Sequence, residues 1–111
     1  MYTIDYYELP SGRAPVEEFI DAQERQAKAA IFALLEKAKA APADVSKHLR
    51  GKIYELRTCS ADGQFRILYF YYVHKSIILV HAFKKKTAKT VHRDIELAEK
   101  RMKEYMERRK K

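Results

Sequence analysis

The chain has 111 residues, of which 47% are apolar and 34% are charged, enough for one domain with its own core. No apolar run approaches the roughly 20 residues of a membrane-spanning helix, and residues 1–8 lack the basic start and apolar stretch of a signal peptide. The single cysteine, Cys59, excludes an internal disulfide and a cysteine-based metal cluster. We therefore expect one soluble, cytoplasmic domain over residues 1–111.

The first part of the chain predicts one strand and two helices. Apolar and aromatic residues alternate with polar ones over residues 1–7, which is typical of a strand. Pro15 suits the first position of a short helix. Apolar residues at helical spacing then predict a second helix over about residues 24–40, which Pro42 ends.

Three further strands are predicted over residues 53–58, 65–73 and 76–83. The turn at residues 60–63 and the tight connection at residues 74–75 join them, and such short links produce an antiparallel meander. The last of these strands is apolar at nearly every position, so we expect both of its faces to be covered.

A final helix is predicted over about residues 91–108, with Thr90 as its N-cap. Its apolar stripe is expected to dock on the sheet and its basic face to point to solvent. The predicted order is β-α-α-β-β-β-α. This order indicates an α+β domain with an antiparallel sheet, two N-terminal helices and one C-terminal helix.

The net charge of +8 is unevenly distributed, because residues 84–111 carry +7 and residues 1–83 only +1. A one-sided basic surface favours a polyanionic partner, but for residues 108–111 we favour a solvated, frayed helix end. Lysines crowd the predicted junction between the last strand and the last helix. Unpaired N–H groups and the helix dipole make such a junction suitable for a phosphate. These lysines are Lys84, Lys85, Lys86 and Lys89.

Two arginines lie inside strands rather than at strand ends. Because only a short hairpin separates Arg57 from Arg66, we expect the two side chains within reach of one ligand. One interpretation is a guanidinium pair that binds an RNA phosphate and stabilises charge in the transition state. The other is a salt bridge from either arginine to Glu55 on the sheet surface. Lys85 and Lys86 follow the neighbouring strand, so they are expected to converge with the arginines.

His81 has two interpretations. It is a half-buried, hydrogen-bonded histidine of the last strand, or it is a general acid or base, since its ordinary pKa of about 6.5 suits proton transfer at neutral pH. The four histidines show no metal-ligand spacing and the carboxylates do not cluster, so the sequence predicts no metal site and no cofactor.

Four motifs in order resemble the RelE superfamily and, within it, its HigB-like branch of bacterial and phage toxins. They are Lys-Ile-Tyr-Glu-Leu-Arg at residues 52–57, Phe-Arg-Ile-Leu-Tyr at residues 65–69, Ile-Leu-Val-His-Ala-Phe at residues 78–83, and Lys-Lys-Thr-Ala-Lys-Thr at residues 85–90. Val91 stands where the family usually has proline, and this change is expected only to loosen the start of the helix.

The resemblance implies the toxin of a type II toxin–antitoxin system: a metal-independent endoribonuclease that cuts messenger RNA, usually in the ribosomal A site, and so inhibits translation. The ribose 2′-OH attacks the adjacent phosphate and a 5′-OH leaves. Its implied partners are messenger RNA, the ribosome and a HigA-like helix-turn-helix antitoxin. The toxin is expected to reach operator DNA only when bound to this antitoxin. The resemblance implies no interaction with a membrane. The catalytic residues would be Arg57, Arg66, Lys85, Lys86 and His81, and the RNA-binding residues Lys84, Lys89, Glu55 and Thr87.

Two other functions remain open on the same fold. ParE-like members of the superfamily inhibit DNA gyrase and cut no RNA. A passive nucleic-acid-binding module would bind RNA or DNA in a strongly salt-dependent way and would be harmless when expressed. Fold alone does not separate these functions.

Overall fold

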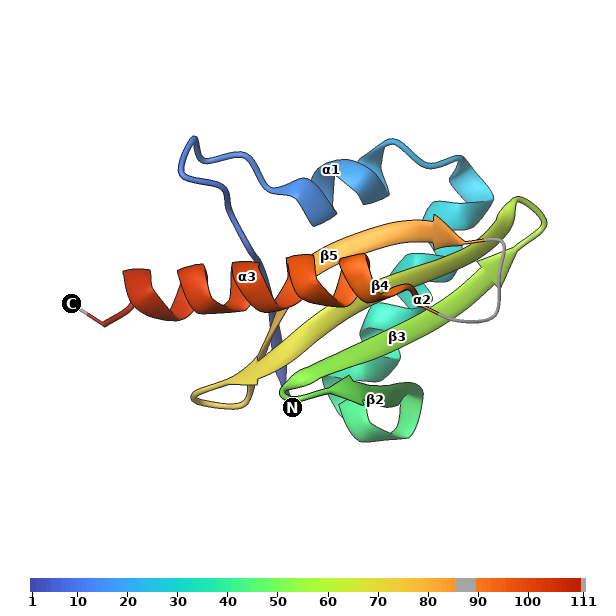
Figure 1. Cartoon of the computed structure of the whole chain (residues 1–111). Helices are drawn as coiled ribbons and strands as arrows, with labels where there is room; N and C mark the ends of the chain where they lie inside the picture. Colours follow the sequence, from blue (N-terminus) through green and yellow to red (C-terminus); the bar gives the residue numbers. More distant parts are fainter. Residues whose placement is uncertain (86–89, 111) are drawn as a thin grey trace.

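The computed structural model of the protein describes residues 1–85 and 90–110. Figure 1 shows an α+β domain in which α3 crosses one face of a twisted sheet and α2 lies behind the other. The elements are, in chain order, β1 (Thr3–Tyr6), α1 (Pro15–Asp21), α2 (Arg25–Ala40), the 3-10 helix η1 (Pro42–Val45), β2 (Ser46–Arg50), β3 (Ile53–Ser60), β4 (Gly63–Tyr72), β5 (Ser76–Lys85) and α3 (His92–Arg108). The predicted α+β class, the helices and the three-strand meander are confirmed.

The sheet differs from the predicted antiparallel one in two respects. Its strand order is β1-β5-β4-β3-β2, and β1 pairs with β5 in parallel, so the sheet is mixed. The strand β2, which the sequence did not predict, pairs with β3 at the other edge. Its residues are mostly polar or charged, because an edge strand needs little apolar surface, and they give no strand signal of their own.

Each face of the sheet has its own core. The face under α1 and α2 buries apolar side chains such as Ile31, Leu56 and Ile67. The face under α3 buries another set, which includes Ile53, Phe70 and Tyr105. Both faces of β5 are therefore covered, as its apolar sequence predicts.

Strand register decides which side chains meet on the α3 face. Arg57 of β3 lies opposite Arg66 of β4, and Arg66 lies opposite Phe83 of β5. A β-bulge in β5 adds Val80 between the residues that face Leu68 and Tyr69 of β4. Because of this extra residue, His81 shares a face with Phe83 but not with Leu79. Strict alternation along the strand would have placed all three together.

The start of α3 is held to the sheet by polar side chains. His81 Nε2 of β5 donates a hydrogen bond of 2.8 Å to Asp94 Oδ1. Arg50 of β2 forms an ion pair of 2.6 Å with Glu99. The helix N-cap is Val91, with no side-chain capping bond, so the prediction that Thr90 caps the helix is wrong. The hydroxyl of Thr90 instead forms hydrogen bonds with Arg66 and Glu55.

Candidate functional site

A buried carboxylate lies under the two predicted arginines. Glu55 is fully buried on β3. Its Oε1 accepts a hydrogen bond of 2.6 Å from Arg57 Nε, and its Oε2 lies 3.6 Å from Arg66 Nη1. The predicted salt bridge to Glu55 is therefore confirmed for both arginines, but it lies in the interior and not on the sheet surface.

The Arg66 guanidinium is enclosed by polar groups. The whole residue is only 1% exposed. Its Nη1 donates a hydrogen bond of 3.1 Å to Thr90 Oγ1, and its Nη2 donates one of 3.2 Å to Gln64 Oε1. A buried guanidinium needs such partners, because an isolated charge is costly to remove from water. Arg66 is thus held in one orientation.

The Arg57 side chain is the accessible member of the pair, with 43% of its surface exposed. Glu55 engages its Nε, while Arg66 is almost wholly buried. Arg57 and Arg66 also line a hollow of about 400 Å³ near the β3–β4 hairpin. The remaining lining residues are Thr58, Cys59, Gln64 and Phe65. Both arginines therefore pair with the buried Glu55 carboxylate and line the same hollow.

The lysines of the junction do not share one face. Lys85 lies opposite Gln64, on the α3 face with the arginines, and its Nζ lies 5.6 Å from the centre of the Phe83 ring. Lys84 lies opposite Phe65 on the other face, and pairs with Asp62 of the hairpin turn at 3.1 Å. Lys85 therefore lies on the same face of the sheet as the arginines, although it is not among the described residues that line their hollow, while Lys84 lies on the opposite face. Lys86, Thr87 and Lys89 lie outside the described residues.

His81 occupies the half-buried position that the first interpretation predicts. Its ring stacks on Phe83 with centroids 5.0 Å apart, and its Nε2 is engaged by Asp94. Burial lowers the pKa of the His81 imidazole, and the hydrogen bond with Asp94 offsets this effect only in part. The imidazole is therefore neutral at pH 7, the form that accepts a proton.

Sequence reasoning missed three polar residues of this site: Gln64, Thr90 as a partner of the arginines, and Asp94. For Gln64 a signal was present, because it is two residues before Arg66 and so on the same face of the strand. The other two belong to the start of α3, whose position over the sheet is a tertiary property. Among residues 1–85 and 90–110, no three His, Cys, Asp or Glu side chains are grouped as metal ligands would be.

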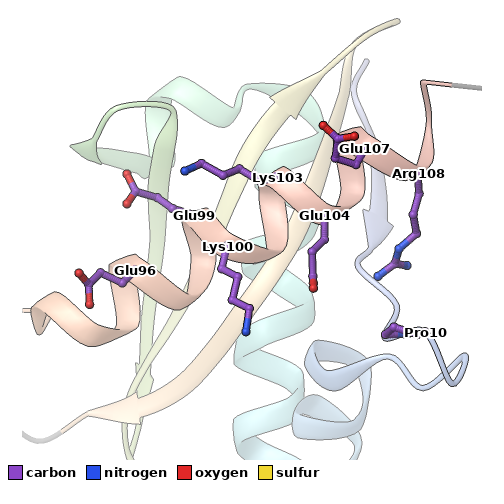
Figure 2. A pocket seen from close by; sticks show the side chains of 8 residues that line it. All are labelled: Pro10, Glu96, Glu99, Lys100, Lys103, Glu104, Glu107 and Arg108. Carbon is purple, nitrogen blue, oxygen red and sulfur yellow. The ribbon is translucent and has the colours of Figure 1, made fainter.

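A larger hollow, of about 600 Å³, lies along α3 and reaches the loop that contains Pro10 (Figure 2). Four glutamates and three basic residues line it: Glu96, Glu99, Glu104, Glu107, Lys100, Lys103 and Arg108. This nearly balanced charge does not suit a polyanion. The arginine pair is therefore the better candidate for an anion site, although its hollow is smaller.

None of the described helices is long and apolar enough to cross a membrane. No curated protein matches the sequence. The family described as "Phage derived protein Gp49-like (DUF891)" matches residues 18–103, a span that contains Glu55, both arginines and most of α3. The chain therefore belongs to this phage-derived Gp49-like family, which is related to toxins of the RelE and HigB type.

Proposed function

We propose that this chain is a HigB-like toxin of a type II toxin–antitoxin system that cleaves messenger RNA without a metal ion. Membership of the Gp49-like family supports the assignment of the chain as a toxin. The observation that supports the nuclease is the arginine pair: Arg57 and Arg66 lie opposite each other and share the buried carboxylate of Glu55.

The charge of the site suits a phosphodiester. The two guanidinium groups and the Glu55 carboxylate beneath them carry one net positive charge, and none of the described residues that line the hollow is acidic. A phosphate gains negative charge on its non-bridging oxygens as a nucleophile adds. Fixed guanidinium donors stabilise that charge without reorganising, which is the largest contribution in many enzymes of this kind.

The proposed reaction is an intramolecular transfer. The ribose 2′-oxygen forms a bond to phosphorus and loses its proton to a base, while the bond from phosphorus to the 5′-oxygen breaks and that oxygen takes up a proton. The products are a 2′,3′-cyclic phosphate and a 5′-OH. Arg57 and Arg66 hold the phosphate, and the proton carriers are drawn from Lys85, Lys86 and His81.

The proposed partners follow from this function. Messenger RNA in the ribosome is the substrate, and Lys89 and Thr87 are RNA contacts beside the lysines that act in the reaction. A HigA-like helix-turn-helix antitoxin neutralises the toxin and brings it to operator DNA. The cytoplasm is the compartment in which such a protein would meet translating ribosomes.

The test uses the purified protein with ribosomes programmed with a defined messenger RNA. We expect cleaved fragments whose 5′ ends polynucleotide kinase labels without prior phosphatase treatment. The Arg57→Ala protein should give no fragments. Intact RNA together with inhibited gyrase supercoiling would favour the ParE-like alternative, and intact RNA with salt-sensitive binding would favour a passive module; either result would overturn the proposal.

A further inference from the structure

The hydroxyl of Thr90 joins the start of α3 to the charged centre of the sheet. It accepts a hydrogen bond of 3.1 Å from Arg66 Nη1 and donates a short one to Glu55 Oε2. Thr90 stands 35 positions from Glu55 along the chain. One side chain therefore contacts both members of a buried ion pair from a different element.

No local role accounts for this hydroxyl. A threonine before a helix ordinarily accepts a hydrogen bond from a backbone N–H of the first turn. Here the backbone oxygen of Val91 accepts from the N–H groups of Asp94 and Ile95, and α3 has no side-chain capping bond. The Thr90 hydroxyl is therefore engaged in a tertiary contact in place of helix capping.

Glu55 supplies the other half of this arrangement. One of its oxygens binds Arg57, and the other faces Arg66 and Thr90. The carboxylate is fully buried, so it has no surface to offer RNA. Its geometry instead keeps the two guanidinium groups at one spacing, since each oxygen serves one arginine.

We propose that Thr90 and Glu55 are positioning residues, which fix the Arg57–Arg66 pair for phosphate and tie it to the start of α3. This inference rests on the proposed nuclease function. A second contact supports it from the far side of Thr90: His81 of β5 holds Asp94 in the first turn of α3. The start of α3 is thus attached to the sheet both before and after Val91.

The kinetic test compares Thr90→Val, which keeps the shape of the side chain but lacks the hydroxyl, with Thr90→Ser, which restores it. Thr3→Val, at an exposed threonine of β1, is the matched control. We expect Thr90→Val to lower kcat about tenfold to hundredfold, the effect of one lost hydrogen bond to a charged group. KM should change less than about twofold, and Thr90→Ser should recover most of kcat. A Thr90→Val protein with the kcat of the wild type would overturn the inference.

A second measurement does not depend on catalysis. In nitrogen-15 NMR spectra, the Nη protons of Arg66 should give separate, slowly exchanging signals, because Thr90, Gln64 and Glu55 hold the guanidinium. These signals should broaden or merge in Thr90→Val and persist in Thr90→Ser and Thr3→Val, while the melting temperatures show that each protein is folded. Unchanged Arg66 signals in a folded Thr90→Val protein would overturn the positioning role. If the wild type cleaves no RNA but the Arg66 signals change as expected, the proposed function fails and the positioning contact stands.

Discussion

Arg57 and Arg66 face each other across β3 and β4, and the two oxygens of Glu55 divide between them. Arg66 is buried and Arg57 is half-exposed. The pair therefore combines one guanidinium that is part of the interior with one that reaches solvent. The two arginines should respond differently to substitution.

Replacement of Arg57 should remove activity without unfolding the protein. Arg57→Ala takes one hydrogen-bond partner from the buried Glu55 carboxylate but leaves it Arg66 and Thr90, so it should cost about 1–3 kcal/mol of stability. Loss of one transition-state donor costs about a hundredfold or more in rate. We therefore expect Arg57→Ala to abolish growth arrest on expression while the protein stays folded, with a lower melting temperature. Arg13→Ala, which breaks an exposed pair with Glu18, is the control and should stay toxic. A fully toxic Arg57→Ala protein would contradict the assignment of the site.

Replacement of Glu55 should destabilise the fold. Glu55→Ala leaves the Arg66 charge in the interior without its carboxylate, and breaking a buried ion pair from one side costs about 3–5 kcal/mol. Urea denaturation measures this loss. Glu36→Ala removes the acidic partner of Lys39 on the surface of α2 and should cost about 1 kcal/mol or less. Equal effects of the two substitutions would show that Glu55 is not a buried structural charge.

Adjacent lysines should behave differently. Lys85 shares a face with the arginines, while Lys84 lies on the opposite face beside Asp62. We expect Lys85→Gln to reduce RNA cleavage at least about tenfold, because a charge close to the phosphate is lost. Lys84→Gln should cleave RNA nearly as the wild type does. Since both variants lose one positive charge, a similar loss of cleavage in both would indicate a general effect of net charge.

The lowered pKa of the His81 imidazole predicts how the stability of the fold depends on pH. Burial lowers the pKa of its imidazole in the folded state, whereas the unfolded chain has the ordinary value of about 6.5. The unfolded state therefore binds the proton more readily. The contribution of His81 to stability is present above pH 6.5 and is lost as the pH falls through the folded-state pKa.

Melting temperatures of the wild type and His81→Gln, taken from pH 7.5 down to pH 5, measure this contribution. The difference between the two proteins should narrow below pH 6.5. A wild type that instead gains stability over His81→Gln as the pH falls would mean that the charged His81–Asp94 pair outweighs burial.

The sequence predicted the elements whose signals are local. Alternation and helical spacing located the meander and the helices, and the short hairpin was enough to bring Arg57 near Arg66. The parallel pairing of β1 with β5 and the polar edge strand β2 were missed, since they depend on contacts between distant parts of the chain.

The same reason explains what was missed in the site. Alternation along β5 indicates that Lys84 and Lys85 point to opposite faces, but only the register with β4 decides which of them meets Arg66. The bulge at Val80 then places His81 on the opposite face of the strand from Leu79. Thr90 is a residue type that often caps a helix N-terminus. Its hydrogen bonds with Arg66 and Glu55 form only because α3 packs over the sheet.

The most direct test of the central claim maps transcript ends in cells after brief induction of the wild type, Arg57→Ala and Lys84→Gln. We expect new 5′-OH ends within translated messages for the wild type and Lys84→Gln, and none for Arg57→Ala produced at the same level. New ends of the same kind and number with Arg57→Ala, or intact transcripts with the wild type while growth stops, would contradict it.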